Sequence, residues 1–406
     1  MLHKAKLSYI YNQVECGINY DYELINKEFN KMLKVCKAPQ GLFMPSERPI
    51  DVYKWSTFMS ERSSSKTTQL LLYGMTFNAL YDTEIQYIRK NKDQITTHYI
   101  TELFKVILMP EFNYIGYLTN GKYNSIHVDR QEKRAYYCKR DDTGLIEEIA
   151  PESFLSALSV DQSERYCSGY NAVRGDYILF DEFSRGAYNT KDDEWVQFNN
   201  ILATIRRERE SVRILLLSNT VSVYNQYLVE LGISKSLTGM KKGDKRVVTA
   251  ELGAKVYVEW LDVDMHKSTR FKRASLEYYG FANPKLKSIY GGEWEYKNFP
   301  RLTRDIEHTV VSRNIYIEIM GKLLVVEVMT GDLPCLHIRP YTKVTPKDDA
   351  IIFTDDDMRC TKANVVKGNR LNMAWLLKVM ANGRLFYASN DCGVMLESFV
   401  KNLQYI

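Results

Sequence analysis

The chain has 406 residues, 45% of them apolar and 26% charged, a composition typical of a globular protein with two or three domains. No apolar run approaches the ~20 residues of a membrane-spanning helix, and the first residues do not resemble a signal peptide. The seven cysteines are scattered without a C-x-x-C pair, so neither a zinc site nor a disulfide framework is expected. A reducing cytoplasm fits this cysteine usage.

The formal net charge of +5 is unevenly distributed along the chain. Residues 241–303 hold 13 Lys and Arg against 8 Asp and Glu, whereas the parts before and after them are close to balance. This excess indicates either a surface that faces a polyanion or an ordinary solvated linker.

The first 80 residues predict a helix and then the context of a phosphate-binding loop. Tyr22 to Val35 has apolar residues at helical spacing, within a segment that looks like an accessory extension. Val52 to Met59 predicts a strand, and Gln69 to Leu80 predicts a buried helix. The small-residue loop between them reads Ser60-Glu61-Arg62-Ser63-Ser64-Ser65-Lys66-Thr67-Thr68.

A strand, a small-residue loop, Lys-Thr and a helix match the context of the Walker A motif, G-x-x-x-x-G-K-[ST]. Such a loop works because backbone N–H groups and the helix N-terminus converge on phosphates. Ser60 and Ser65 stand where the motif has its glycines, and serine would be strained wherever the loop needs a positive φ. The alternative interpretation is a serine-rich turn that caps a helix.

A second motif follows about a hundred residues later. The apolar run Tyr177 to Phe180 predicts a buried strand of a parallel sheet, and it leads directly into Asp181 and Glu182. In the Walker B element of P-loop NTPases, the first acid holds Mg²⁺ and the second polarises the attacking water. The alternative is a strand that simply enters a solvated loop.

Further elements surround the two motifs. Glu84 to Arg89 predicts a strand with Lys90 and Lys92 just beyond it, and residues 134–139 and 145–149 predict a hairpin. These segments would lie between the Walker A helix and the Walker B strand.

Asp192 to Arg209 is the clearest predicted helix, with an acidic start and an arginine-rich end. The arginines either complement the helix dipole or present a cation to the phosphates of a neighbouring subunit. Arg213 to Leu217 predicts a buried strand that ends in Ser218 and Asn219. Polar residues at the carboxyl end of a strand beside Walker B face the nucleotide in parallel-sheet NTPases.

Together these segments resemble the genome-packaging ATPases of small phi29-like tailed phages. The resemblance is carried by Asp181-Glu182-Phe183-Ser184-Arg185, by Ile205 to Arg213 and by Leu217 to Asn225. It extends over roughly residues 50–406, including the loop with Arg62 and these further runs: Tyr87 to Lys92, Val160 to Glu164, Phe353 to Asp357 and Ala381 to Phe386. The departures are the N-terminal extension and the two missing Walker A glycines.

The resemblance implies roles for the motif residues, with ATP and Mg²⁺ as cofactors. The nucleotide would be bound by Ser60, Arg62, Ser63, Ser64, Ser65, Lys66, Thr67 and Thr68. Thr67 and Asp181 would hold Mg²⁺, and Glu182 would be the general base.

The same resemblance implies residues that act between subunits or sense the nucleotide. Arg207, with Arg206 as the competing choice, would be an arginine finger for the neighbouring subunit. Lys92 would be a second cation acting in trans. Ser218 and Asn219 would sense the γ-phosphate.

The fold expected from the resemblance is an α/β P-loop NTPase of the additional-strand (ASCE) type with a parallel central sheet. A linker and a small α+β domain follow it. The expected boundaries are an N-terminal extension over 1–45, the ATPase domain over 46–284, a linker over 285–303 and the last domain over 304–406.

The last hundred residues predict an order of elements that is compatible with an RNase H-like fold. The predicted strands are Asn314 to Ile319, Lys322 to Val328, Cys335 to Ile338 and Arg384 to Ala388, and the predicted helices are Ala363 to Met380 and Val394 to Leu403. Terminase-type motors carry a nuclease here, and a two-metal nuclease needs converging carboxylates. The candidates are Glu318, Glu327, Asp332 and Asp391, although the resemblance implies a degenerate, inactive nuclease.

We therefore expect a ring-forming viral ATPase that couples ATP hydrolysis to translocation of double-stranded DNA into a procapsid. The alternatives are a terminase large subunit with an active nuclease and a non-catalytic DNA-binding or scaffold protein with a degenerate P-loop. DNA would be gripped through its phosphates. The candidate contacts are Lys122, Asn124, Lys241, Lys242, Lys245 and Arg246.

The resemblance also implies partners and a location. It suggests a homo-oligomeric ring, with five subunits as the suggested number, bound to a portal and procapsid. It leaves a packaging RNA open as a further partner and implies no membrane. The protein would act in the host cytoplasm, transiently on the procapsid, and be absent from the mature virion.

Overall fold

The structure is a computed structural model, and it divides the chain into two compact units. The first comprises Met1–Arg185, Lys191–Val221 and Glu230–Glu293, and the second comprises Gly186–Thr190, Ser222–Val229 and Trp294–Ile406. The residues that the structure describes are 20–37, 52–60, 65–163, 170, 172, 174–183, 194–207, 209–219, 226–233, 237, 240–241, 243–250, 253–261, 299–302, 310–319, 322–332, 334–342, 350–354 and 364–403. Among them, no helix is both long enough and apolar enough to span a membrane.

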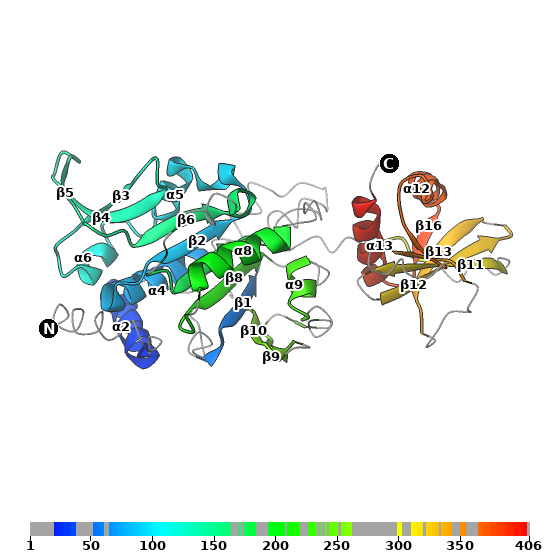
Figure 1. Cartoon of the computed structure of the whole chain (residues 1–406), viewed down its shortest axis with the longest axis horizontal. Helices are drawn as coiled ribbons and strands as arrows, with labels where there is room; N and C mark the ends of the chain where they lie inside the picture. The colour runs from blue at the N-terminus through cyan, green and yellow to red at the C-terminus, as the bar shows by residue number, and fades with distance from the viewer. Residues whose placement is uncertain are drawn as a thin grey trace, which may run out of the picture. The chain divides into compact units, whose positions relative to one another are not determined.

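In the described part of the first unit, ten strands form one sheet (Figure 1). The strand order is β3-β4-β6-β2-β7-β8-β1-β10-β9, and β5 also pairs with β4. The strands are β1 (Trp55–Ser60), β2 (Ile85–Arg89), β3 (Ser125–Val128), β4 (Arg134–Arg140), β5 (Ile146–Ile149), β6 (Leu155–Ser159), β7 (Tyr177–Asp181), β8 (Arg213–Asn219), β9 (Lys245–Thr249) and β10 (Lys255–Trp260).

The six central strands, from β6 to β10, are parallel, which confirms the predicted parallel sheet. The sequence predicts this because these strands read as continuous apolar runs, as strands covered on both faces do. Strand β8 lies between β1 and β7, with Ser60 beside Asn219 and Asp181 beside Leu217. The two Walker segments and the end of β8 therefore meet at one edge of the sheet.

Helices cover this sheet, and one of them corrects an interpretation of the sequence. The helical elements of the first unit are α2 (Tyr22–Val35), α4 (Lys66–Tyr81), η1 (Lys92–Ile95), α5 (Thr97–Leu103), α6 (Tyr114–Leu118), η2 (Val160–Gln162) and α8 (Glu194–Arg206), and α9 (Gln226–Glu230) follows β8 in the chain. Helix α2 has the predicted bounds, but it is no accessory element. Its Ile25, Phe29, Met32 and Leu33 are buried in the same core as α4.

Helix α4, which begins at the Walker A lysine, packs directly against the sheet. At Gly74 a Cβ atom would lie 2.8 Å from the side chains of both Ile85 on β2 and Tyr177 on β7. Such a distance is shorter than real side-chain contacts allow, so only glycine lets the helix approach this closely. The close contact sets the position of the Walker A helix relative to the Walker B strand.

Within Trp294–Ile406, the described part of the second unit is a six-stranded sheet with two helices. Its strand order is β15-β14-β11-β12-β13-β16. The elements are β11 (Val310–Ile319), β12 (Lys322–Thr330), β13 (Cys335–Pro340), β14 (Ile352–Thr354), β15 (Val365–Lys367), α12 (Ala374–Ala381), β16 (Leu385–Tyr387) and α13 (Asn390–Asn402). Side chains of α12 and α13 share one apolar core with Ile317 and Val326 of the sheet.

The predicted helix from Ala363 to Met380 is wrong in its first half. Residues 365–367 form strand β15, which pairs with β14 through Val365 and Ile352, and the helix begins only at Ala374. The β-branched pair Val365-Val366 suits a strand, and pairing with β14 fixes that choice. The start of the predicted helix from Asp192 lies outside the described residues, and the helix is described from Glu194 to Arg206.

Candidate active site

The two adjacent carboxylates lie at the carboxyl end of β7. Asp181 is the last residue of the strand and is only 4% exposed. Glu182 follows it with a φ of +54°, a left-handed conformation that is uncommon for residues other than glycine. Such backbone conformations cluster at functional sites.

Asp181 receives hydrogen bonds from two elements of the first unit. The Thr67 hydroxyl lies 3.2 Å from each carboxylate oxygen, and the Tyr87 hydroxyl donates at 2.9 Å. Thr67 stands in the first turn of α4 and Tyr87 on β2, so Walker A and Walker B residues meet as predicted.

Arg89, at the end of β2, bridges both acids, and the sequence analysis missed it. One guanidinium nitrogen lies 2.7 Å from Glu182 and the other 3.2 Å from Asp181. The side chain is 2% exposed, with its guanidinium 5.1 Å from the ring centre of Tyr99. Burial would lower the pKa of Arg89, but the oxygens of Tyr87 and the two acids outweigh it and raise that pKa.

Lys66, the predicted Walker A lysine, is 6% exposed at the start of α4. Burial lowers the pKa of Lys66 to about 8, and the nearby charges of Asp181 and Glu182 offset only part of this effect. A cation held at this cost is placed to bind an anion, because a phosphate would restore the charged form.

This shift predicts how stability depends on pH in the protein free of metal and nucleotide. The pKa of Lys66 is 10.5 in its unperturbed state and about 8 in the fold, so between these values the unfolded chain binds the extra proton. Stability from this group therefore rises by up to about 3 kcal/mol as pH increases from 8 to 10.5, and it is level below 8 and above 10.5. Urea unfolding should show this rise in wild type and not in Lys66→Met. Parallel profiles would contradict it.

Of the two serines in the candidate phosphate-binding loop that stand in glycine positions, only Ser65 has the strained positive φ. Ser65 has a φ of +57° at the N-cap of α4, whereas Ser60 is an extended residue of β1. Thr68 lies in the first turn of α4. Residues Arg62, Ser63 and Ser64 lie outside the described residues.

The strain at Ser65 gives a stability prediction. Ser65→Gly should keep or raise the free energy of unfolding, because glycine adopts a positive φ without a Cβ clash. Ser65→Val should lower it by about 1–2 kcal/mol, because a β-branched residue is poorly tolerated there. Urea unfolding measures both. The matched control Thr68→Val, in helical backbone, should cost less than Ser65→Val, and equal losses would contradict the strain.

The residues present fit a magnesium ion bound with a nucleotide. Mg²⁺ in such sites takes one or two protein oxygens, and phosphates and water complete its octahedron. Thr67 and Asp181 supply a hydroxyl and a carboxylate side by side. No cluster of three or more His, Cys, Asp and Glu that could hold a metal occurs among the described residues, and a nucleotide-bound Mg²⁺ does not need one.

The predicted γ-phosphate sensors lie at the same edge of the sheet. Ser218 is fully buried on β8, beside Met59 of β1, and Asn219 is beside Ser60. Their backbone therefore ends where the phosphate-binding loop begins, as the sequence predicts.

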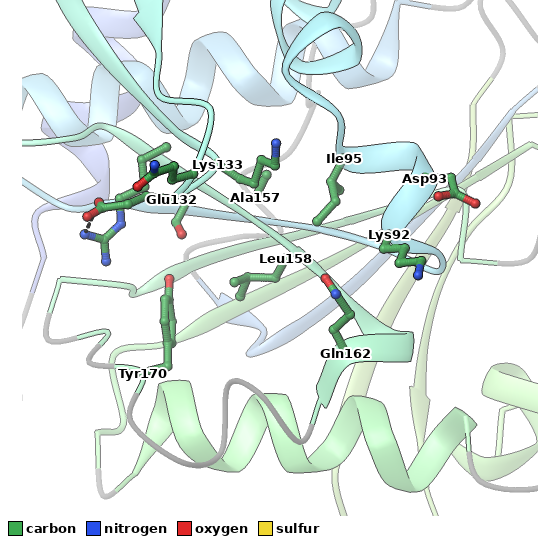
Figure 2. Close-up of a pocket in the computed structure, with 12 residues that line it drawn as sticks. Lys92, Asp93, Ile95, Glu132, Lys133, Ala157, Leu158, Gln162 and Tyr170 are labelled. Carbon is green, nitrogen blue, oxygen red and sulfur yellow. Dashed lines mark hydrogen bonds and ion pairs between the residues drawn. The ribbon is translucent and has the colours of Figure 1, made fainter.

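Lys92 does not join the Asp181 cluster. It starts η1, where its N–H donates to Asp161 at 3.0 Å, and its side chain lines a pocket of about 470 Å³. Figure 2 shows Lys92 and Gln162 at one end of this pocket, away from Tyr170. The neighbouring Lys90 instead forms an ion pair of 2.9 Å with Glu194, at the start of α8.

The two candidate arginine fingers are exposed at the other end of α8. Arg206 is the last helical residue, and Arg207 has a φ of +48°. The next arginine, Arg209, forms an ion pair of 2.8 Å with Asp176, which directly precedes β7. Asp176 is five residues before Asp181, about 16 Å along a strand. The structure therefore does not bring Arg206 or Arg207 to the carboxylates of their own subunit.

The candidate DNA contacts fall into two separate groups. Lys122 pairs with Glu148 at 3.1 Å, and the Asn124 side chain bonds to the backbone of Arg140. Lys245 and Arg246 belong to β9, Lys241 is exposed just before it, and Lys242 lies outside the described residues. The strands β3 and β9 are the two ends of the sheet, roughly 40 Å apart at ~4.8 Å per strand.

The candidate nuclease acids of the second unit do not converge where they are described. Glu327 contacts His337 at 2.9 Å and Arg339 at 2.6 Å. Burial would raise the pKa of Glu327, but these hydrogen bonds outweigh it and lower that pKa. Glu318 is on β11 beside Thr354, Asp332 lies in the turn after β12, and the Asp391 side chain is outside the description. Because Arg339 and His337 occupy its oxygens, Glu327 is a poor metal ligand.

Comparisons with known proteins agree with this geometry. The family model described as podovirus DNA encapsidation protein (Gp16) matches residues 145–241, which include β7, α8 and β8. No curated protein sequence matches the chain.

Two solved structures share the fold. One is the bacteriophage Phi-29 viral genome packaging motor assembly, with a TM-score of 0.53 and 16% identity over 89% of this chain and 99% of that chain. The other is the Phi-28 gp11 DNA packaging motor, with a TM-score of 0.52 and 12% identity over 86% and 95%. The family match over residues 145–241 and the shared fold confirm the resemblance to the phi29-like genome-packaging ATPases.

Proposed function

We propose that this chain is a ring-forming ATPase that couples ATP hydrolysis to translocation of double-stranded DNA into a procapsid. The observation that carries the proposal is the meeting of Thr67, Asp181 and Glu182 at one edge of a parallel sheet with the fold of packaging motors. Strand β8, inserted between β1 and β7, supports the additional-strand type of P-loop fold.

In this proposal each residue of the site has one task. Lys66 binds the β- and γ-phosphates, and Thr67 with Asp181 holds the magnesium ion. Mg²⁺, when bound, neutralises charge that develops on the phosphates. Glu182 orients the attacking water and accepts its proton.

Arg89 must release Glu182 before that step. At 2.7 Å the guanidinium occupies the carboxylate oxygen that would have to face the water. The contact also pairs the buried Asp181 and the partly exposed Glu182 with a cation while no nucleotide is bound, because a buried charge needs a partner. We infer that Arg89 leaves Glu182 when nucleotide binds; Thr67 and Asp181 would hold a magnesium ion there, and its charge would take over the pairing of Asp181.

A ring is supported by where the remaining cations lie. Arg206 and Arg207 end α8 close to Arg209, which pairs with Asp176 at the end of β7 opposite Asp181, so we assign them to a neighbour's nucleotide. Lys92, outside the Asp181 cluster, acts in the same way. Five subunits, a portal and procapsid as partners, and a location in the host cytoplasm are proposed from the resemblance to the packaging motors.

For the second unit we propose an RNase H-like domain that docks DNA or the motor. Strands β11, β12 and β13 are antiparallel, and β14 and β15 add in parallel on the other side of β11. The first five strands have the order 3-2-1-4-5, which supports the expected fold, and the sixth strand, β16, pairs with β13. The ion pairs of Glu327 favour the docking role over metal-dependent cutting.

The first test is ATP hydrolysis by the purified chain with and without double-stranded DNA. DNA should stimulate hydrolysis. The logarithm of the DNA-binding constant should fall steeply and linearly with the logarithm of the salt concentration. No hydrolysis under either condition would contradict the proposal.

Mixed rings test whether the arginine acts in trans. Arg207→Ala and Glu182→Gln subunits should each be nearly inactive alone, whereas their mixture should regain hydrolysis at interfaces that pair an intact Glu182 with an intact Arg207. The exposed Arg130 supplies the control, since Arg130→Ala should behave as wild type. A mixture that stays inactive while wild-type rings turn over would contradict the trans role.

A further inference from the structure

Outside the nucleotide site, the most deeply buried acid of the first unit is Asp176, at 0% exposure. It precedes β7, at the end of the strand opposite Asp181. Its carboxylate accepts hydrogen bonds from the hydroxyls of Tyr20 at 2.6 Å and Ser211 at 2.5 Å, and Arg209 pairs with it at 2.8 Å. One acid thus joins the N-terminal segment to the chain that follows α8.

Arg209 links this acid to the end of α8. One of its guanidinium nitrogens donates to the carbonyl of Ile205, in the last turn of the helix, while another pairs with Asp176. Its backbone N–H also donates to the carbonyl of Arg206 at 2.9 Å. Arg209 therefore links the turn that contains Arg206 and Arg207 to Asp176.

Tyr20 is itself held in place by aromatic packing. Its ring lies 4.5 Å from the ring of Phe77 and 5.2 Å from that of Tyr81, both edge-on, in α4. Tyr22, two residues on, lies 5.1 Å below the guanidinium of Arg213, at the start of β8. Burial raises the pKa of Tyr20, and the charge of Asp176 raises it further, so the hydroxyl remains a donor.

From these contacts we infer that Tyr20 is a positioning residue for the trans-acting arginine. Its hydroxyl orients Asp176, Asp176 holds Arg209, and Arg209 fixes the last turn of α8 from which Arg207 projects toward the neighbouring subunit. The inference rests on the proposed trans role of Arg207. It gives a catalytic purpose to the N-terminal segment, in which the sequence shows no chemistry.

The physical reason lies in how a buried carboxylate is satisfied. Without the Tyr20 hydroxyl, one carboxylate oxygen of Asp176 keeps only the Ser211 donor, so the buried network that holds Arg209 is weakened. A catalytic group displaced by about 1 Å can lose up to about 100-fold in rate, even when the altered residue is far from the chemistry.

The test uses full-length Tyr20→Phe, which removes one oxygen and keeps the ring. We expect kcat for DNA-stimulated ATP hydrolysis to fall about tenfold with KM for ATP within about twofold, because the subunit's own site is intact. The matched control is Tyr22→Phe, whose ring contacts Arg213. Its kcat should stay within about twofold of wild type.

Mixed rings separate a defective arginine donor from a general structural defect. Tyr20→Phe mixed with Glu182→Gln should regain activity, because the second subunit brings an intact arginine to an intact site. Tyr20→Phe mixed with Arg207→Ala should not regain it, since both lack a working donor.

Three results would overturn the inference. The first is an unchanged kcat in Tyr20→Phe. The second is recovery of activity when Tyr20→Phe is mixed with Arg207→Ala. The third is no recovery when Tyr20→Phe is mixed with Glu182→Gln, although Arg207→Ala mixed with Glu182→Gln does recover. The mixture of Arg207→Ala with Glu182→Gln, run in parallel, distinguishes failure of the trans role of Arg207 from failure of the role of Tyr20. If it stays inactive, the trans role of Arg207 fails and this inference fails with it. If it recovers, only the role of Tyr20 is at stake.

Discussion

Replacing Glu182 by glutamine should lower steady-state ATP hydrolysis by about 10²–10⁴-fold, the usual contribution of a general base. The amide keeps the size and the position of the side chain but cannot accept a proton from water. Binding of MgATP should stay within about threefold, because Lys66, Thr67 and Asp181 are unchanged. Hydrolysis is measured as phosphate release with saturating DNA, and binding is measured by calorimetry.

The matched control is Glu210→Gln, a glutamate of the same unit whose side chain is 81% exposed. Its kcat should remain within about twofold of wild type. Activity of Glu182→Gln within tenfold of wild type would mean that another group accepts the proton. If Glu182→Gln loses both MgATP binding and activity, the result would instead indicate a structural role for Glu182.

Replacing Arg89 by methionine should lower the free energy of unfolding by about 3–5 kcal/mol in the absence of metal and nucleotide. The substitution leaves Asp181 and Glu182 without the cation that bridges them, in a place where the arginine side chain is only 2% exposed. Urea unfolding at constant pH and salt measures the loss. It should be partly recovered by adding Mg²⁺, which can replace the missing charge.

Two further variants sharpen this result. Arg89→Lys keeps the charge but not the fork that reaches both acids, so its loss should be smaller than that of methionine. In the double variant Arg89→Met with Glu182→Gln, one of the two unpaired charges is removed. Its loss in free energy of unfolding should therefore be smaller than the sum of the losses of the two single variants. A loss for Arg89→Met below about 1 kcal/mol would contradict the bridging role.

Periodicity and motif spacing predicted the part of the site that lies on continuous segments. Strand β7 with its two acids, the lysine and threonine at the start of α4, and the end of β8 are all where the sequence places them. They are predictable because a parallel sheet brings the carboxyl ends of its strands to one edge. The positive φ at Ser65 also follows from a serine that stands in a glycine position.

Arg89 could not be predicted in the same way, although a signal was present. Its ion pair with Glu182 joins residues 93 positions apart, and the two residues meet because β2 and β7 are adjacent strands of the sheet. An arginine at the end of a buried strand was the available signal, because a buried guanidinium requires an acid.

The short strands of the second unit show a different limit. Strands β14 and β15 have three residues each, too few for an alternating pattern to identify. Each is defined by pairing with a distant strand, and the local sequence around Val365 is equally compatible with a helix until that pairing is known. The boundary at Ala374 therefore depends on tertiary contacts.

The proposed function is tested most directly by displacement of a third strand from double-stranded DNA. A labelled oligonucleotide bound as a triplex is released only when a motor moves along the duplex beneath it. The account predicts release by wild type that requires ATP and Mg²⁺, and none by Glu182→Gln. Release without ATP, or ATP hydrolysis by wild type without any release, would contradict it.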